Sequence, residues 1–303
     1  MSPPVVRVVA FLAAGVAALL APAFAHAYGW PIVPFDQQHA IRGAFDDPRQ
    51  GRGIDGLFEN SFHFGVDISA PDGTAVYAVA PGTVFRYPDS VTVRQPDGHE
   101  FAYWHIVAAV TEHAYVSTGD LIGYVRLGWG HVHLAEWDGH TYLNPLRPGA
   151  LEPFTDTTTP VVGDIDVGVE NGVLTATVEA YDPPPIQPPP PWQDALWTPA
   201  FVRWRLTRDG QEVIPWRIAA DFRTNWLHGG DFNEVYAPGT QQNRPFDPGR
   251  YIFWLANDLD VRGLQPGTYQ LEVLASDTRD NTGSRTISFT IGQSRNTAKR
   301  ASR

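Results

Sequence analysis

Short runs of β-branched and aromatic residues alternate with turn dipeptides over residues 41–148. Asp72-Gly73 and Asp97-Gly98 are two of these turns. Runs of four to eight such residues, bounded by glycine, proline and aspartate, are typical of β-strands. The pattern therefore predicts that the first half of the chain folds as an all-β domain.

The clearest predicted hairpin joins residues 91–95 to residues 99–107 through a turn at Asp97-Gly98. An Asp-Gly pair between two alternating runs is a strong hairpin signal. His105 lies near the end of the second strand of this hairpin.

The second half of the chain carries strands in which apolar and polar positions alternate strictly. Val202, Trp204 and Leu206 alternate with arginine and threonine, and the same period recurs in residues 269–273 and 287–291. Each of these strands therefore has one apolar face. Strands of this kind at this spacing indicate an immunoglobulin-like β-sandwich. The predicted fold class is all-β, with an N-terminal antiparallel β-sheet domain followed by that sandwich.

Breaks in this pattern predict the domain boundaries. The threonine-rich stretch after residue 150 is typical of a linker, and the prolines of residues 183–191 are typical of a surface insertion in the polyproline conformation. We expect a signal peptide over residues 1–27, the first β domain over 28–150, a linker over 151–160, the sandwich with its proline-rich insertion over 161–293, and a disordered basic tail over 294–303.

The N-terminal residues have the parts of a secretory signal. Arg7 supplies a positive charge, residues 8–20 are apolar, and residues 23–25 form a small-x-small cleavage site. The apolar run is too short for a membrane span, which needs about 20 residues. We therefore expect an exported protein, periplasmic or extracellular, that is not integral to a membrane. An uncleaved N-terminal anchor is the alternative.

Composition narrows the chemistry. With 303 residues the chain is long enough for about two domains, each with its own core. The formal net charge is −11, so we expect no nucleic-acid partner. The chain has no cysteine, which excludes disulfides, thiolate catalysis and cysteine-bound metals. Any metal must therefore be held by histidine and carboxylate side chains.

Four histidines between positions 63 and 133 stand in contexts that can converge on one site. His131 and His133 are two residues apart on a predicted strand, so their side chains point to the same face. His63 and Asp67, four residues apart, are by themselves weak evidence for a metal site, since such a pair is more often a surface pair. His105 is the fourth histidine. A catalytic zinc takes three protein ligands and leaves a position for water, so spacing alone leaves open which side chains bind metal.

Residues 63–68 (His-Phe-Gly-Val-Asp-Ile) and the stretch that follows closely resemble the opening of the lysostaphin-type (LytM-like) zinc metallopeptidases. Residues 103–106 (Tyr-Trp-His-Ile) are similar to that family's central histidine motif, and residues 116–123 to its glycine-marked strand pair. Residues 130–134 (Gly-His-Val-His-Leu) are similar to its His-x-His motif. The resemblance covers about residues 40–148, and its specificity lies in five residues in the right order.

The resemblance implies a LytM-like β domain that binds one Zn²⁺ per chain through His63, Asp67 and His133. His105 and His131 would be its catalytic histidines. It also implies a zinc metalloendopeptidase that hydrolyses peptide bonds in peptidoglycan cross-links, with the sandwich used for positioning or wall binding. Two loops that would border the cleft are shorter than in many relatives, which leaves substrate preference open.

Two other functions stay open. One is a non-catalytic LytM-like protein that binds the cell wall or regulates another hydrolase. Relatives of that kind usually lack one or more of the five residues, all of which are present here. The other is a secreted protease that acts on protein substrates, which shares every catalytic residue with the leading hypothesis. The sequence indicates neither an oligomeric state nor which catalytic histidine is the base.

The remaining polar groups are expected to be structural or solvated. The histidines in this class are His39, His99, His113, His140 and His228. Glu136 and Asp138 follow the His-x-His pair and are expected at a solvated strand end. The acidic clusters at residues 258–260 and 277–280 lack the ordered spacing of a known calcium loop, so the sequence predicts no calcium site.

Overall fold

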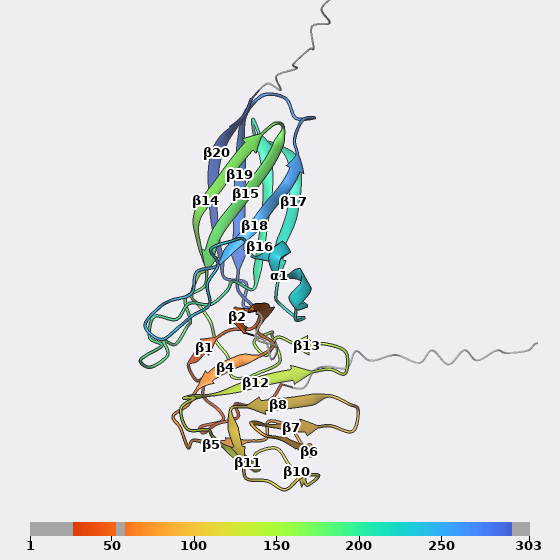
Figure 1. The fold of residues 1–303 in the computed structure, drawn as a ribbon, viewed down its shortest axis with the longest axis vertical. Helices are drawn as coiled ribbons and strands as arrows, with labels where there is room; N and C mark the ends of the chain where they lie inside the picture. Colours follow the sequence, from red (N-terminus) through yellow and green to blue (C-terminus); the bar gives the residue numbers. More distant parts are fainter. Residues whose placement is uncertain (1–26, 53–57, 293–303) are drawn as a thin grey trace, which may run out of the picture.

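The computed structural model describes residues 27–52 and 58–292, which form two β units placed one on the other (Figure 1). The predicted all-β class is confirmed, because the described residues contain a single α-helix, α1 (Phe232–Val235), preceded by a 3-10 turn, η1 (Gly229–Asp231). The predicted signal peptide, except for residue 27, and the predicted tail lie outside the described residues.

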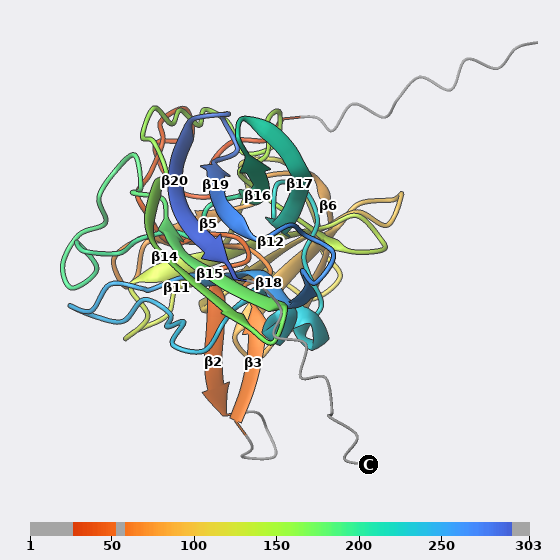
Figure 2. The same ribbon diagram turned by 90° about the horizontal axis from the view of Figure 1, so that it is seen from above.

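The N-terminal unit contains an eight-stranded sheet, a three-stranded sheet and a two-stranded hairpin. The eight-stranded sheet has the order β1 (Ile41–Gly43), β4 (Val66–Ser69), β12 (His131–Trp137), β8 (Glu100–Trp104), β7 (Ser90–Arg94), β6 (Gly82–Tyr87) and β10 (Tyr115–Val116), with β13 (Tyr142–Leu143) paired to β12. The three-stranded sheet has the order β5 (Ala75–Tyr77), β11 (Leu121–Val125) and β9 (Ile106–Ala108). The hairpin pairs β2 (Pro48–Arg52) with β3 (Phe58–Phe62) and stands out from the body of the molecule in Figure 2.

The core of this unit lies between its two larger sheets. Alternation in β8 buries Phe101 and Tyr103, whereas the other three residues of the strand stay partly exposed. The same hydrophobic cluster takes in Val66 from β4 and Val76 from β5, one from each sheet. Because successive side chains of a strand point to opposite faces, β4 and β12 are left with a second face on which polar side chains gather.

The C-terminal unit is the predicted sandwich. One of its sheets has the order β14 (Val161–Glu170), β15 (Val173–Tyr181) and β18 (Ile252–Asp260). The other has the order β17 (Gln211–Asp221), β16 (Phe201–Arg208), β19 (Gly267–Ser276) and β20 (Thr282–Ile291). The predicted alternation is seen in β16, where Val202, Trp204 and Leu206 are buried, and in β19, where Tyr269, Leu271 and Val273 are buried. Among the described residues, no helix has the length and apolar content that crossing a membrane requires.

Side chains cross between the two units. Phe62 belongs to the hydrophobic cluster of the sandwich, and Trp197 belongs to that of the N-terminal unit. The indole Nε1 of Trp197 donates to the carbonyl oxygen of Ile41 at 3.1 Å, and the hydroxyl of Tyr236 donates to that of Asp46 at 2.9 Å. The predicted domain boundary, a linker over residues 151–160, stays a prediction. The contacts described above join residues on either side of it.

Glu136 departs from the expected solvated strand end, because its side chain is buried. Its carboxylate accepts a hydrogen bond from the Tyr28 hydroxyl at 2.7 Å and pairs with the Arg147 guanidinium at 2.6 Å. His99 Nε2 lies 3.0 Å from the same carboxylate. A buried carboxylate needs such partners, and these lie 11 to 108 residues away along the chain. Asp138 is exposed, as expected.

Candidate functional site

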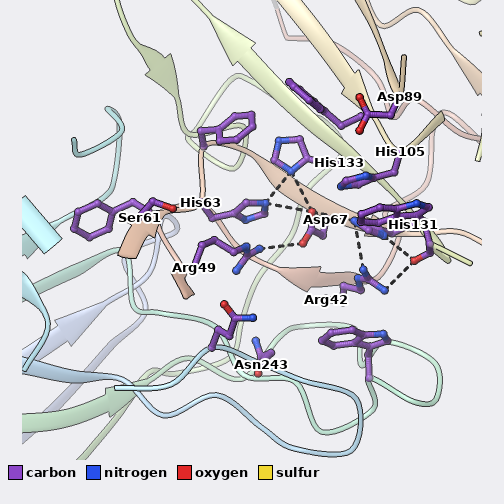
Figure 3. A pocket seen from close by; sticks show the side chains of 16 residues that line it. Arg42, Arg49, Ser61, His63, Asp67, Asp89, His105, His131, His133 and Asn243 are labelled. Atoms are coloured by element: carbon purple, nitrogen blue, oxygen red, sulfur yellow. Dashed lines mark hydrogen bonds and ion pairs between the residues drawn. The ribbon is translucent and has the colours of Figure 1, made fainter. Parts of the chain in front are cut away.

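The polar face of β4 and β12 forms the floor of a cleft. The two strands pair antiparallel with His133 opposite Asp67, and β12 also places His131 on this face (Figure 3). Val132, between the two histidines, is fully buried on the other face. The strand period of two therefore brings both imidazoles of the His-x-His motif into one cleft, as the sequence predicted.

His63 reaches this floor from the short connection between β3 and β4. Its Nδ1 lies 2.7 Å from the carbonyl oxygen of Ala44, which can only accept, so Nδ1 carries the proton. Nε2 is therefore left with a free lone pair that points into the cleft. Burial, followed by the nearby Arg49 charge, lowers the pKa of His63 to about 3, so the ring is neutral.

The glycine inside the His63–Asp67 motif has a packing role. A Cβ atom at Gly65 would stand 2.7 Å from Nε2 of His133. Any side chain there would push against that imidazole, so a residue without one lets the two strands approach closely.

Three donor atoms meet at the floor of the cleft. Nε2 of His63 lies 2.8 Å from Nδ1 of His133 and 3.2 Å from Oδ1 of Asp67, and the last two atoms are 3.1 Å apart. Bonds of about 2.05 Å in a tetrahedral zinc site would separate the ligand atoms by about 3.3 Å. The three donors thus match one triangular face of such a site in both spacing and chemistry. His63, Asp67 and His133 fit a zinc ion.

The second oxygen of Asp67 is held by an arginine. Nη2 of Arg49, on β2, donates to Oδ2 at 3.0 Å, which leaves Oδ1 turned to the two histidines. Burial alone would raise the pKa of Asp67, but the imidazoles of His63 and His131 hold it well below its ordinary value. The carboxylate is therefore ionised, with one oxygen oriented by Arg49 and the other directed to the metal position.

His105 and His131 stand beside these donors. His105, between β8 and β9, has a positive φ of 64° and its ring stacks on Trp129 at 3.6 Å. Its ring centroid is 4.7 Å from that of His131. Burial, followed by the imidazoles of His131 and His133, lowers the pKa of His105 to about 3. Two imidazoles outside the donor triangle are thus available for proton transfer.

The orientation of His131 is set by the backbone. Its Nδ1 donates to the carbonyl oxygen of Trp129 at 2.8 Å, so Nε2 is an acceptor. Nη2 of Arg42 lies 3.4 Å from this Nε2, and Oδ1 of Asp67 lies 3.4 Å from it. The acceptor nitrogen of His131 therefore faces the cleft next to the metal position.

The sandwich side of the molecule closes one wall of the cleft, whose volume is about 580 Å³. Trp192, Gln242 and Asn243 line it from that side. The guanidinium carbon of Arg42 lies 4.3 Å from the centre of the Trp192 ring, a cation–π contact between the two units. The walls of the cleft are therefore built by both halves of the chain.

The structure brings His63, Asp67, His105, His131 and His133 together in this cleft. The histidines expected to be structural or solvated do not line it; these are His39, His99, His113, His140 and His228. Sequence reasoning missed Arg42, Arg49 and Trp192. No motif marks them, because each comes from a segment whose place depends on tertiary packing.

Residues 61–145 match the model of peptidase family M23. This segment contains all five of the histidine and aspartate residues that meet in the cleft. The resemblance to LytM-like peptidases is thereby confirmed for the domain, although the match covers less than a third of the chain. It supports a metallopeptidase, a hydrolase of peptide bonds.

Three solved structures are similar to parts of this chain. A zinc-containing peptidase from Vibrio cholerae is 18% identical with a TM-score of 0.34, and the match covers 41% of this chain and 41% of that chain. Csd3 from Helicobacter pylori is 21% identical with a TM-score of 0.32, over 40% of this chain and 34% of that one. The M23 protein EnpA of an Enterococcus faecalis prophage, as a mutant catalytic domain, is 23% identical with a TM-score of 0.28, over 42% and 99%.

This chain spans less than half the length of the first two of these proteins. Because the TM-scores are below 0.5, the M23 family match and not these likenesses identifies the domain. A comparison with curated proteins gives no match.

Proposed function

We propose that the chain is an exported zinc-dependent endopeptidase that hydrolyses peptide bonds in peptidoglycan cross-links. The observation that carries the proposal is the convergence of three metal donors and two further imidazoles at the floor of one open cleft. The M23 match to the same segment supports the reaction class. The substrate class follows from the resemblance to LytM-like peptidases.

The proposed metal ligands are His63, Asp67 and His133, holding one zinc ion per chain. Zinc bound by three protein ligands lowers the pKa of water to about 7 and polarises a carbonyl group. Arg49 keeps the Asp67 carboxylate oriented for this task through its 3.0 Å contact to Oδ2. The Ala44 carbonyl keeps His63 in the tautomer that leaves Nε2 free.

His105 and His131 are proposed as the catalytic residues. One of them accepts the proton of the attacking water and returns it to the leaving amine, while the other stabilises the negative charge that develops on the carbonyl oxygen. The lowered pKa of His105 keeps its ring neutral at pH 7. His131 is held by the Trp129 carbonyl with its acceptor nitrogen toward the cleft, next to Arg42.

Arg42 is suited to contact a polar group of the substrate. Its guanidinium lines the cleft, where Nη1 donates to the carbonyl oxygen of Trp129 at 3.1 Å and Nη2 lies 3.4 Å from Nε2 of His131. A guanidinium carries five N–H donors, so others remain for a carbonyl or carboxylate oxygen of the substrate.

The proposal is tested by mass analysis of soluble products released from purified peptidoglycan by the zinc-loaded mature protein. His133→Ala removes a proposed zinc ligand, and His140→Ala, at an exposed histidine that does not line the cleft, is the matched control. We expect the wild type and His140→Ala to release fragments with new termini inside the cross-links, and His133→Ala to release none.

Two results would overturn the proposal in different directions. Zinc binding without release of any product would favour the non-catalytic wall-binding or regulatory function. Cleavage of protein substrates together with intact peptidoglycan would favour the protein-directed protease. Export is tested separately by recovering the protein outside the cytoplasm and sequencing its N-terminus. We expect that cleavage has occurred directly after the small-x-small site at residues 23–25.

A further inference from the structure

Three aspartates that are distant in the sequence meet where the sandwich joins the M23 domain. Asp156 lies in the segment between the two units, Asp182 follows the last residue of β15, and Asp277 follows the last residue of β19. One carboxylate oxygen from each lies within 4.8 Å of the others. Two strand ends of the sandwich and the connecting segment therefore present three acidic groups to one point.

All three side chains are removed from water. Asp156 is 7% exposed, Asp182 is 2% exposed and Asp277 is 4% exposed. The nearby Arg279 guanidinium is directed elsewhere, to the carbonyl oxygens of Leu146 and Phe154 and to the Glu152 carboxylate. Three buried carboxyl groups without a bridging cation are costly, because burial penalises each charge and the charges repel one another.

Two of the carboxylates are held in place by neighbouring donors. Oδ1 of Asp156 accepts hydrogen bonds from the backbone N–H of Thr158 at 2.8 Å and from its hydroxyl at 2.6 Å. Oδ1 of Asp277 accepts from the backbone N–H of Arg279 at 2.8 Å and of Asn281 at 2.9 Å. These bonds orient both groups without neutralising them.

The third carboxylate has no partner of this kind. Oδ1 of Asp182 makes no hydrogen bond within the described residues, and it is shielded from water, because Asp182 is only 2% exposed. Burial, followed by the charges of Asp156 and Asp277, raises the pKa of Asp182 to about 9. An enclosed carboxylate beside two others, with an unsatisfied oxygen, is the arrangement that a bound cation would complete.

The structure also provides room for one ion. A cavity of about 20 Å³ adjoins the three aspartates, enough for a single ion or water molecule. Phe45 and Asn144 line it from the M23 side, and Trp197 lines it from the other. An ion in this cavity would therefore contact groups from both halves of the chain.

We propose that Asp156, Asp182 and Asp277 bind one Ca²⁺ ion at the junction between the M23 domain and the sandwich. The donors are all oxygen atoms, which suit a hard cation and not zinc, and no imidazole belongs to the group. Ca²⁺ tolerates irregular oxygen geometry, whereas Mg²⁺ demands a near-ideal octahedron. The ion ties the ends of β15 and β19 to the segment that leads out of the M23 domain.

The bound cation would hold the sandwich, which supplies one wall of the cleft, in place against the M23 domain. Thr198, which also lines the cavity, donates its backbone N–H to Asp47 at 2.9 Å, and Asp47 in turn accepts from the backbone of Ala44. Ala44 supplies the carbonyl that orients His63. The proposed ion is thus linked to the zinc donors through a short series of direct contacts, and its existence does not depend on the proposed function.

The test is thermal unfolding of the full zinc-loaded chain during titration with Ca²⁺. Asp182→Asn removes the unpartnered carboxylate with little change of shape, and Asp280→Asn makes the same change at an exposed residue of the same loop as Asp277. We expect saturating Ca²⁺ to raise the unfolding temperature by roughly 4–8 °C in the wild type and Asp280→Asn. Asp182→Asn should show no such shift.

Three outcomes would overturn the proposal. The first is a wild type that does not respond to Ca²⁺, as expected if Asp182 merely carries a proton. The second is a full response in Asp182→Asn, which would place the ion elsewhere. The third is an equal response to Mg²⁺, which would contradict the choice of Ca²⁺. His133→Ala should keep the Ca²⁺ shift, so a failed zinc site and a failed calcium site are told apart.

A second measurement covers the case in which Asp182→Asn does not fold. Tb³⁺ replaces Ca²⁺ in oxygen sites, and Trp197 lines the cavity closely enough to sensitise its emission. We expect the zinc-loaded wild type to give sensitised emission that added Ca²⁺ displaces. Absence of emission, or emission that Ca²⁺ leaves unchanged, would overturn the proposal without any variant.

Discussion

The ring of Phe62 lies in the hydrophobic core of the sandwich, while the next residue, His63, is one of the three proposed metal ligands of the M23 domain. Phe62 is 1% exposed, and its ring centroid lies 5.4 Å from that of Phe232 and 5.7 Å from that of Tyr236. Its carbonyl oxygen accepts a hydrogen bond from Trp226 Nε1 at 2.9 Å. The sandwich therefore holds the backbone from which a proposed zinc ligand projects.

Replacing Phe62 by leucine should weaken zinc binding as well as the fold. The smaller side chain leaves space in the sandwich core, and we expect a loss of about 1–2 kcal/mol of unfolding free energy. Because the space left by the smaller side chain lies next to His63, the affinity for zinc should fall as well. Urea unfolding and zinc titration check the two effects.

Phe253→Leu is the matched control, since Phe253 is fully buried in the same core but is not adjacent to a proposed ligand. It should lose similar stability and keep its zinc affinity. Equal zinc affinity in Phe62→Leu and Phe253→Leu would contradict the coupling between sandwich and metal site.

Gly43→Ala should disturb the Arg49–Asp67 pair directly. A Cβ atom at Gly43 would stand 2.7 Å from Nη2 of Arg49 and 2.8 Å from Oδ2 of Asp67, closer than such atoms approach. We expect the carboxylate to shift and zinc affinity to fall about tenfold or more, the usual effect of disturbing a ligand's partner. Isothermal titration with zinc measures it.

Gly168→Ala is the control for this change, because nothing lies within 4 Å of a Cβ atom placed there on β14. Its zinc affinity should equal that of the wild type. If Gly43→Ala also binds zinc normally, the orientation of Asp67 by Arg49 is not needed for the site.

Sequence reasoning reached the five cleft residues through the resemblance to LytM-like peptidases, since local patterns alone left the metal ligands open. The strand period puts His131 and His133 on one face, and the turn at residues 97–98 predicts the hairpin that presents His105. The structure adds Arg49 and Trp192, which reach the cleft only because a hairpin and a proline-rich segment fold back over it. No local period encodes such a return.

The acidic groups illustrate the same limit. The cluster at residues 277–280 lacks the spacing of a contiguous calcium loop, whereas the carboxylates that lie close to Asp277, those of Asp156 and Asp182, come from distant segments. The sequence predicts a solvated strand end for Glu136, as for Asp138. Its burial depends on Tyr28 and Arg147, which the sequence alone does not place beside it.

Glu136→Gln should remove a component of stability that depends on pH. Burial opposes its charge, but hydrogen bonds from Arg147 and then His99 lower the pKa of Glu136 from 4.5 to about 2. A carboxyl with a lowered folded-state pKa stabilises the protein above pH 4.5, and this contribution is lost as the pH falls toward 2. It amounts to about 3 kcal/mol at most.

The free energy of unfolding of wild type and Glu136→Gln, measured in urea from pH 7 to pH 3, checks this prediction. The two curves should differ most above pH 5 and approach each other at the acid end. Glu100→Gln, which breaks the surface pair with Arg94, should differ from the wild type by less than about 1 kcal/mol. A constant offset for Glu136→Gln at all pH values would contradict the linkage.

His105→Asn separates catalysis from metal binding. The backbone of His105 has a φ of 64°, a left-handed conformation that asparagine adopts more readily than most residues, so the variant keeps the local fold. His105 is not one of the three converging donors, and its proposed role is proton transfer or stabilisation of developing charge. We expect kcat to fall roughly 10²–10⁴-fold with the zinc content unchanged.

His133→Ala should lose zinc and activity together, and His140→Asn should lose neither. Retention of full activity in His105→Asn would remove it from the mechanism, whereas loss of zinc would make it a ligand and leave His131 as the one imidazole free to move a proton.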